Sequence, residues 1–308
     1  MSNLEKILEF FKTVSITTLS QLFWLFGLLF IIGFILYLIA RFTRTTYVKT
    51  TGSTFDVFVT GWIGTPIHEL GHAILCLIFR HKITEIKLYT PNTTDGTLGY
   101  VNHTYDSKSI YQKVGNFFIG IGPILFGAFV IYFLFYLLVP NNQEVFGSLD
   151  YQSKILIKGI HGKFNGIWES LSKSIIYTFN TLLTKANFSN YKFWVFLYLA
   201  FCISSHMELS PADIKGSWRG LLTIILLFFC VNLIIIGLET LGFSNHLGKW
   251  WHYIKLDSYA LSINKFIGMF GAIFIFSTIL SGLNFILTYI GLTIFSFFKG
   301  KGIVNPFW

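Results

Sequence analysis

Charged residues are scarce in this sequence. Aspartate, glutamate, lysine and arginine together make up 12% of its 308 residues, whereas about a quarter of the residues in a typical soluble domain are charged. Hydrophobic residues make up 53% of the chain, and the mean hydropathy is +0.63. This composition excludes an ordinary soluble protein and predicts an integral membrane protein that crosses the bilayer several times.

Cysteine is scarce as well. The sequence has three cysteines, Cys76, Cys202 and Cys230, and each lies in an apolar run. A free thiol in such a run behaves as a small hydrophobic side chain. We therefore expect neither a disulfide framework nor a zinc site built from cysteines.

Acidic residues are outnumbered by basic ones, which gives a net charge of +9. The lysines and arginines stand mostly between apolar runs, where lipid headgroups attract them. The charge therefore predicts contact with a lipid bilayer and no binding to nucleic acid. Because lysine and arginine are almost evenly divided between alternate loops, the positive-inside rule does not set the orientation.

Six apolar stretches are long enough to cross a bilayer, which takes roughly 20 residues. They lie at about 19–40, 57–79, 114–139, 193–209, 220–238 and 266–297. The last is long enough to break at Ser281–Gly282 into a hairpin of two shorter helices. We expect one α-helical, membrane-embedded domain over residues 1–308, with about six transmembrane helices, a core at 55–240 and a basic amphipathic loop at 141–190 on the membrane surface.

The segment 83–105, between the second and third apolar stretches, has a different character. Ile86–Tyr89 and Thr97–Val101 resemble strands, and turn-forming pairs, Pro91-Asn92 and Asp95-Gly96, separate them. This pattern predicts a small β-hairpin at the membrane surface.

Few ionisable residues lie at membrane depth, where they are costly and usually functional. The second stretch contains His68, Glu69 and His72, and the fourth contains His206 and Glu208 near its end. Asp213 follows in the short junction before the fifth stretch. These six residues are the candidates for a functional site.

The sequence His68-Glu69-Leu70-Gly71-His72 has the spacing of a helical zinc motif. Residues four apart lie on one helix face, so His68 and His72 can direct imidazole nitrogens at one zinc ion. Glu69 lies about 100° around the helix and can act as a general base toward a water that zinc activates. The motif predicts zinc binding and hydrolysis.

Catalytic zinc sites use three protein ligands, so a third must come from elsewhere. Asp213 is favoured because the second and fourth helices run the same way and bring it to the same side as the motif. Pro211 would break a helix there and admit irregular backbone. The alternatives are that Asp213 caps the fifth helix, or that His206 or Glu208 is the ligand. His206 and Glu208 could also orient a ligating histidine.

These residues resemble the site-2 protease family of intramembrane zinc metalloproteases. The central motif matches the family's His-Glu-x-Gly-His, in which the histidines bind zinc and the glutamate is the base. Gly122-Pro123 is similar to the start of its Gly-Pro-x-x-Asn motif, and Pro211-Ala212-Asp213 to its Asn-Pro-x-Asp-Gly motif, whose aspartate binds zinc. The chain departs from the family at three positions, Phe126, Ser210 and Ile214, where the family has Asn, Asn and Gly.

The resemblance implies an intramembrane zinc metallopeptidase that cleaves membrane-associated proteins or peptides in a bacterial inner membrane, with the zinc face cytoplasmic. It also implies a surface β-element, so the 83–105 hairpin either adds a substrate strand to its edge or merely closes a loop. Two other classes stay open. One is a zinc-containing transporter or scaffold without catalysis, and the other is a zinc hydrolase of a lipid or small amphiphile.

Overall fold

The computed structural model describes residues 2–52, 56–91, 97–143, 182–243 and 260–307, together with a few positions between 172 and 251. Most of the surface loop expected at 141–190 lies outside these residues, so that prediction is not tested.

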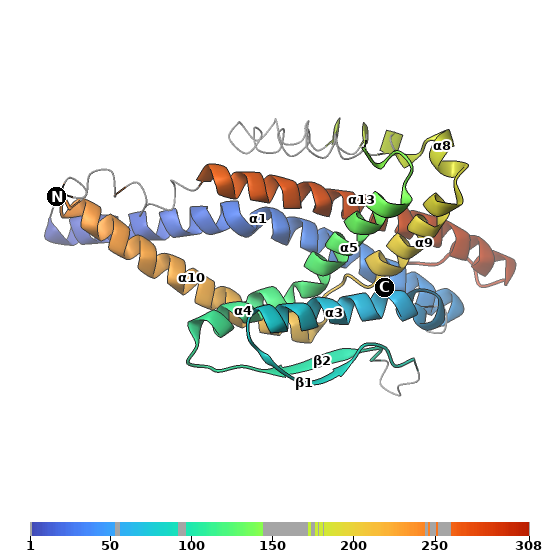
Figure 1. The fold of residues 1–308 in the computed structure, drawn as a ribbon, viewed down its shortest axis with the longest axis horizontal. Helices are drawn as coiled ribbons and strands as arrows, with labels where there is room; N and C mark the ends of the chain where they lie inside the picture. Colours follow the sequence, from blue (N-terminus) through green and yellow to red (C-terminus); the bar gives the residue numbers. More distant parts are fainter. Residues whose placement is uncertain are drawn as a thin grey trace.

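Three long helices extend along the molecule. α1 (Asn3–Thr51) begins at a capping box in which Ser2 and Glu5 bond each other's backbone, and it ends at Gly52, whose φ is +74°. α13 (Ala260–Phe298) lies beside α1 (Figure 1). α10 (Pro211–Thr240) returns toward the start of α1, where the buried amide of Asn232 donates to Thr18 and Gln21. A satisfied amide of this kind fixes the pairing of two apolar helices.

Shorter helices fill the centre. A π-helix, η1 (Asp56–Gly61), leads into α3 (Trp62–Ile78). α4 (Ile110–Gly120) and α5 (Gly122–Leu138) meet at Ile121 with a bend of 58°. Pro123 at the start of α5 explains the break, because proline favours the first turn of a new helix. α8 (Lys185–Phe188) precedes α9 (Tyr191–Ser205).

The apolar helices support a helical membrane protein, but the prediction of six spans is wrong for the part of the chain described. Three helices are long and apolar enough to cross a membrane, Leu29–Thr51, Pro211–Thr240 and Ile273–Phe298, and the bent α4–α5 pair makes a fourth if it is one span. The stretches expected at 57–79 and 193–209 form helices of 17 and 15 residues, which are shorter than the roughly 20 residues that a span requires. α13 continues through Ser281–Gly282 without a break.

A two-stranded antiparallel sheet confirms the predicted hairpin. β1 (Lys82–Lys87) pairs with β2 (Tyr100–Thr104), with Ile86 opposite Val101 and an irregularity between Ile83 and Glu85. The expected strands are shifted: β1 begins four residues before Ile86 and ends two before Tyr89, and β2 begins and ends three residues later than Thr97–Val101. In Figure 1 the sheet lies below α3 and α4.

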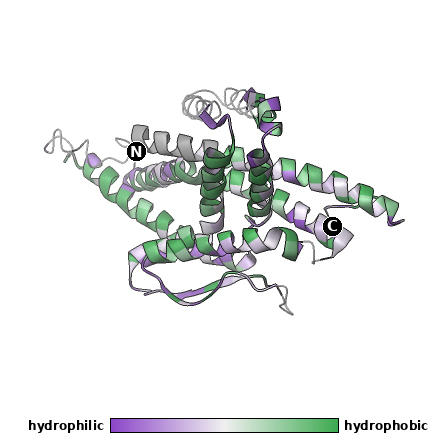
Figure 2. Ribbon diagram, turned by 45° about the vertical axis from the view of Figure 1, so that its right-hand side comes forward, coloured by the Kyte–Doolittle hydropathy of each residue, from purple (hydrophilic) through white to green (hydrophobic). Residues whose placement is uncertain are grey.

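The core is almost entirely aliphatic and phenylalanine. The larger cluster joins α5, α9 and α13 around Phe135, whose ring contacts Phe196 and Phe276 edge to face. A smaller cluster places Phe117 of α4 against Phe26 of α1. Figure 2 shows hydrophobic residues over most of the helical surface and a more mixed hairpin. This arrangement leaves α3 between the core and the sheet.

Candidate metal centre

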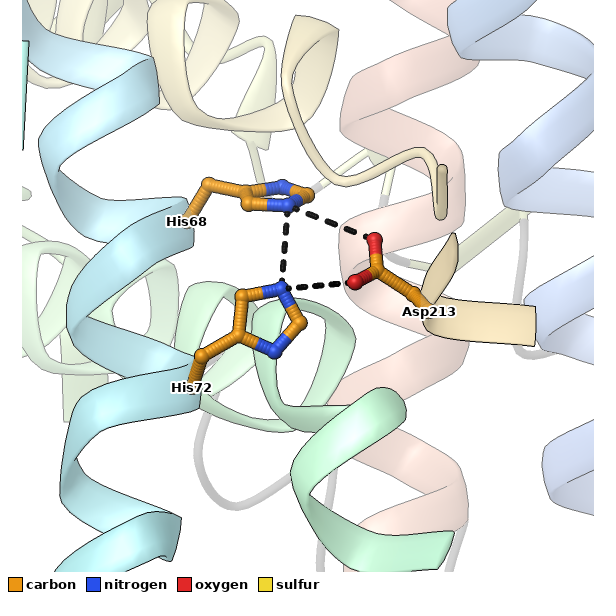
Figure 3. Close-up of side chains that lie close together, drawn as sticks. All are labelled: His68, His72 and Asp213. Carbon is orange, nitrogen blue, oxygen red and sulfur yellow. Dashed lines mark hydrogen bonds and ion pairs between the residues drawn. The ribbon is translucent and has the colours of Figure 1, made fainter. Parts of the chain in front are cut away.

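α3 carries the histidine motif on its buried side. His68 and His72 are one turn apart, and His72 is 7% exposed. α10 begins at Pro211 and carries Asp213 in its first turn. The two helices place these three side chains opposite each other, as Figure 3 shows.

The three side chains converge at short distances. His68 Nε2 lies 3.3 Å from His72 Nε2. Asp213 Oδ1 lies 3.2 Å from His72 Nε2, and Asp213 Oδ2 lies 3.8 Å from His68 Nε2. Ligands about 2.0–2.1 Å from a tetrahedral zinc ion are about 3.3 Å apart. One ligand atom from each of the three residues lies within 4.8 Å of the others, so the triad could hold a metal ion.

Both histidines are held in the tautomer that a metal ligand requires. The Nδ1–H of His68 donates to the backbone carbonyl of His206 at 2.7 Å, and that of His72 donates to the carbonyl of Ile119 at 2.7 Å. A neutral imidazole then carries its lone pair on Nε2. Carbonyl bonds of this kind orient metal-ligating histidines. Two Nε2 lone pairs and a carboxylate consequently face one another, which is unfavourable unless a cation or a proton lies between them.

Asp213 lies beside both histidines and also helps to start α10, although it is not itself the N-cap. The N-cap of α10 is Ser210, whose Oγ accepts from the Asp213 backbone at 3.2 Å. Asp213 Oδ2 accepts from the Ser210 backbone at 2.8 Å, which completes a capping box. The cap fixes the carboxylate at the position where it meets the histidines.

His206 and Glu208 lie outside the triad. α9 ends at Ser205, and the turn that follows directs the His206 carbonyl to His68. Its ring donates through Nδ1 to the carbonyl of Cys202 at 3.2 Å, and Nε2 lies 3.6 Å from Asp56 Oδ1. Glu208 pairs with Arg44. His206 thus orients His68 through its backbone, and Glu208 is engaged elsewhere.

Arg44 and Asp56 are functional candidates that the sequence did not reveal. Arg44 Nε lies 3.1 Å from Asp56 Oδ2, and the same guanidinium pairs with Glu208. Asp56 is 3% exposed. Both residues flank apolar runs, where a charge ordinarily reaches headgroups or water, so only their pairing across the fold distinguishes them.

Glu69 lies beside the triad with no hydrogen bond to the described residues. It is 6% exposed and packs against Gly99, where a Cβ would lie 2.9 Å from Glu69 Cγ. Two cavities meet at His68 and Glu69. One, of about 440 Å³, also contains His72, Asp213 and residues of β2. A buried carboxylate with no hydrogen bond among the described residues, beside the triad, is suited to accept a proton from water.

His103, contributed by β2, is a third histidine of the same cavity. Its Nδ1–H donates to His81 Nδ1 at 3.0 Å, and His81 Nε2–H donates to the carbonyl of Gln112 at 2.8 Å. Burial, with smaller contributions from the charges of His81 and His72, lowers the pKa of His103 to about 4. His103 is therefore neutral at pH 7. It had no signal in the sequence, since a lone histidine in a strand is ordinary.

Gly122 contacts the helix that carries the histidines, whereas Phe126 lies away from the two cavities. Gly122 lies against the backbone of Gly71, within the histidine motif. Phe126 stacks on Phe129 with ring centroids 6.4 Å apart, and it lines neither of the two cavities beside the triad.

No protein-family model, curated protein or solved structure matches this chain. The resemblance to site-2 proteases therefore rests on the three short sequence motifs alone.

Proposed function

We propose that the protein is an intramembrane zinc metallopeptidase of the site-2 protease type. The observation that carries the proposal is the convergence of the two Nε2 atoms and the Asp213 carboxylate within 3.2–3.8 Å, with both Nδ1–H groups already bonded to carbonyls. Nitrogen and carboxylate ligands in this number are those of catalytic zinc sites. We place the protein in a bacterial inner membrane with the metal on the cytoplasmic side, following the resemblance.

Glu69 acts as the general base. A bound zinc ion would polarise the scissile carbonyl and make water more acidic. Glu69 lines the same cavity as the three ligands, so its carboxylate can take up the proton of the attacking water. The same group can return that proton to the leaving amine. Its burial keeps competing water away from the reaction.

The position of the hairpin is an argument for a peptide as the substrate. Consecutive residues of β2 and its approach, from Gly99 to His103, line the cavity that contains the triad. Within the described residues, β2 pairs with β1 along one side only. An extended peptide can add to the other side as a further strand. Such a strand would bring its backbone amides toward the three side chains, which is what peptide hydrolysis requires.

The geometry favours catalysis over a purely structural zinc site. A structural site is closed by four protein ligands, whereas a catalytic site leaves one position open. Among the described residues, three side chains form the group. His206 and Glu208, which would have closed it, are turned toward Asp56 and Arg44. A transporter or scaffold remains the alternative, and it predicts zinc without cleavage.

Replacing Glu69 tests the mechanism. Glu69→Gln keeps the shape of the side chain and removes the base, so we expect one zinc ion per chain and a loss of peptide cleavage of at least 100-fold. Metal content is measured by mass spectrometry, and cleavage with peptide and lipid ester substrates in detergent. Glu9→Gln, at an exposed position of α1, is the matched control.

Three outcomes separate the possibilities. Cleavage by Glu69→Gln at the wild-type rate contradicts the assigned base. Zinc in the wild-type protein without cleavage of any substrate favours the scaffold or transporter. Cleavage of lipid esters but not of peptides favours the amphiphile hydrolase.

A further inference from the structure

A second cavity, of about 420 Å³, adjoins the metal centre on the α1 side. His68, Glu69, Thr97 and Gly99 line both cavities. The remaining walls come mainly from α1 and from the segment that leads into α10, with Thr65 of α3, and they include Arg41 and Arg44. A peptide lying along β2 across Glu69 therefore passes directly into this second space.

The two arginines of the cavity differ in their partners. Arg44 is bonded to the carboxylates of Asp56 and Glu208, which offset its charge. Arg41 Nη1 lies 3.5 Å from the Tyr37 hydroxyl, and no carboxylate of the described residues lies within 4.0 Å of its guanidinium. Arg41 is thus an exposed cation with no acidic partner among the described residues, and it lies in a candidate membrane span. Charges in such positions commonly serve a ligand.

A second polar group of the same cavity lacks a hydrogen-bond partner among the described residues. The Thr65 hydroxyl is buried and forms no hydrogen bond with them. Thr65 is 5% exposed. A buried hydroxyl without a partner is costly. An oxyanion held by Arg41 could also accept a hydrogen bond from the Thr65 hydroxyl. Both the Arg41 guanidinium and the Thr65 hydroxyl would then have a hydrogen-bond acceptor.

We propose that this cavity binds a carboxylate group of the substrate through Arg41. A guanidinium presents paired N–H donors that match a carboxylate. The carboxylates of Glu69 and Glu208 line the same cavity and would repel a doubly charged phosphate more strongly than a singly charged carboxylate. The inference rests on the proposed peptidase function and narrows its substrates to peptides with a carboxylate near the scissile bond. That group is either an acidic side chain or the C-terminus of the substrate.

Peptide binding, measured separately from cleavage, tests the inference. Fluorescent peptides are titrated against the zinc-loaded Glu69→Gln protein in detergent, and their anisotropy is followed. One series replaces Asp and Glu by Asn and Gln, and the other amidates the C-terminus, so the two series distinguish the two sources of the carboxylate. We expect one of these changes to weaken binding roughly 10-fold or more.

Variants then assign the effect to Arg41. In the Glu69→Gln background, Arg41→Gln should abolish the preference for the carboxylate peptide. Arg41→Glu should reverse it in favour of the matching lysine peptide. Arg219→Gln, at an exposed position of α10, removes a guanidinium elsewhere and should leave the preference intact. Zinc content of one ion per chain verifies that each variant is folded.

The outcomes of this test are distinct from those of the Glu69 experiment. Equal binding of carboxylate and amide peptides, binding of neither, or a preference that survives Arg41→Gln would overturn the assignment of Arg41. The peptidase proposal could still hold in each of these cases, because cleavage by the wild-type protein decides it separately.

Discussion

The Asp213 carboxylate makes two separate contacts, and a single substitution could remove both at once. Its Oδ2 accepts from the Ser210 backbone at 2.8 Å, while Oδ1 lies 3.2 Å from His72 Nε2. The first contact starts α10 and the second completes the triad. Because Ser210 contributes the other half of the capping box, the helix start can be perturbed without touching the triad.

Two variants separate these two contacts. Asp213→Asn keeps an oxygen for the Ser210 backbone but removes the charge, so zinc affinity should fall by more than the roughly 10–100-fold that follows loss of a ligand's hydrogen-bond partner. Ser210→Ala should lower the free energy of unfolding by about 1 kcal/mol and retain zinc. Competition with a chelator measures affinity, and thermal unfolding measures stability. Wild-type zinc affinity in Asp213→Asn would show that the aspartate only caps.

The residues of the site were predictable to different degrees. His68, Glu69 and His72 follow from a local helical spacing that the chain carries within five positions. Asp213 required an argument about which ends of helices meet. The sequence allowed His206 to orient a ligating histidine, but it did not show that the contact is made by its backbone carbonyl after α9 ends. The role of Arg44 was out of reach, because it acts through the carboxylates of Asp56 and Glu208.

At the scale of elements, two glycines set how closely α3 and α5 approach. A Cβ at Gly71 would lie 2.7 Å from the carbonyl oxygen of Gly122, and a Cβ at Gly122 would lie 2.7 Å from that of Gly71. The contact is therefore backbone against backbone. It also explains why glycine stands inside the histidine motif, because any side chain there would displace α3 from α5.

Gly71→Ala should push these helices apart. Overpacking of this kind costs about 1–3 kcal/mol, and we also expect weaker zinc binding because His68 and His72 lie on the displaced helix. Gly282→Ala is the matched control, since a Cβ at that position of α13 meets nothing within 4 Å. Its stability should be unchanged or slightly raised. Equal melting temperatures and zinc affinities for Gly71→Ala and wild type would refute this account of the contact.

Hydropathy correctly located the apolar helices along the chain, but it did not predict where each helix begins and ends. The apolar stretch at 114–139 is correct in place, but it holds two helices because Pro123 starts a new one after Ile121. The stretch at 57–79 begins as a π-helix, which leaves 17 residues for α3. Apolar composition records which residues avoid water. It does not record where the backbone changes direction, and the count of six spans failed for that reason.

At the scale of the molecule, the triad joins parts that are distant in the sequence. α3 packs on α5 and the hairpin, whereas α10 packs on α4 and returns to α1 through the Asn232 contacts. An ion between His68, His72 and Asp213 would tie these two parts together. Metal binding and global stability should then be linked, because the unfolded chain does not hold the three ligands in place.

Removing the metal should therefore destabilise the whole fold. A ligand present at 1,000 times its dissociation constant stabilises the folded state by about 4 kcal/mol. We expect a chelator to lower the melting temperature of the detergent-solubilised protein, and zinc to restore it. Magnesium should not restore it, since magnesium prefers oxygen ligands. His72→Ala should melt at the same temperature with or without chelator. An equal chelator effect on wild type and His72→Ala would show that the stabilising metal lies elsewhere.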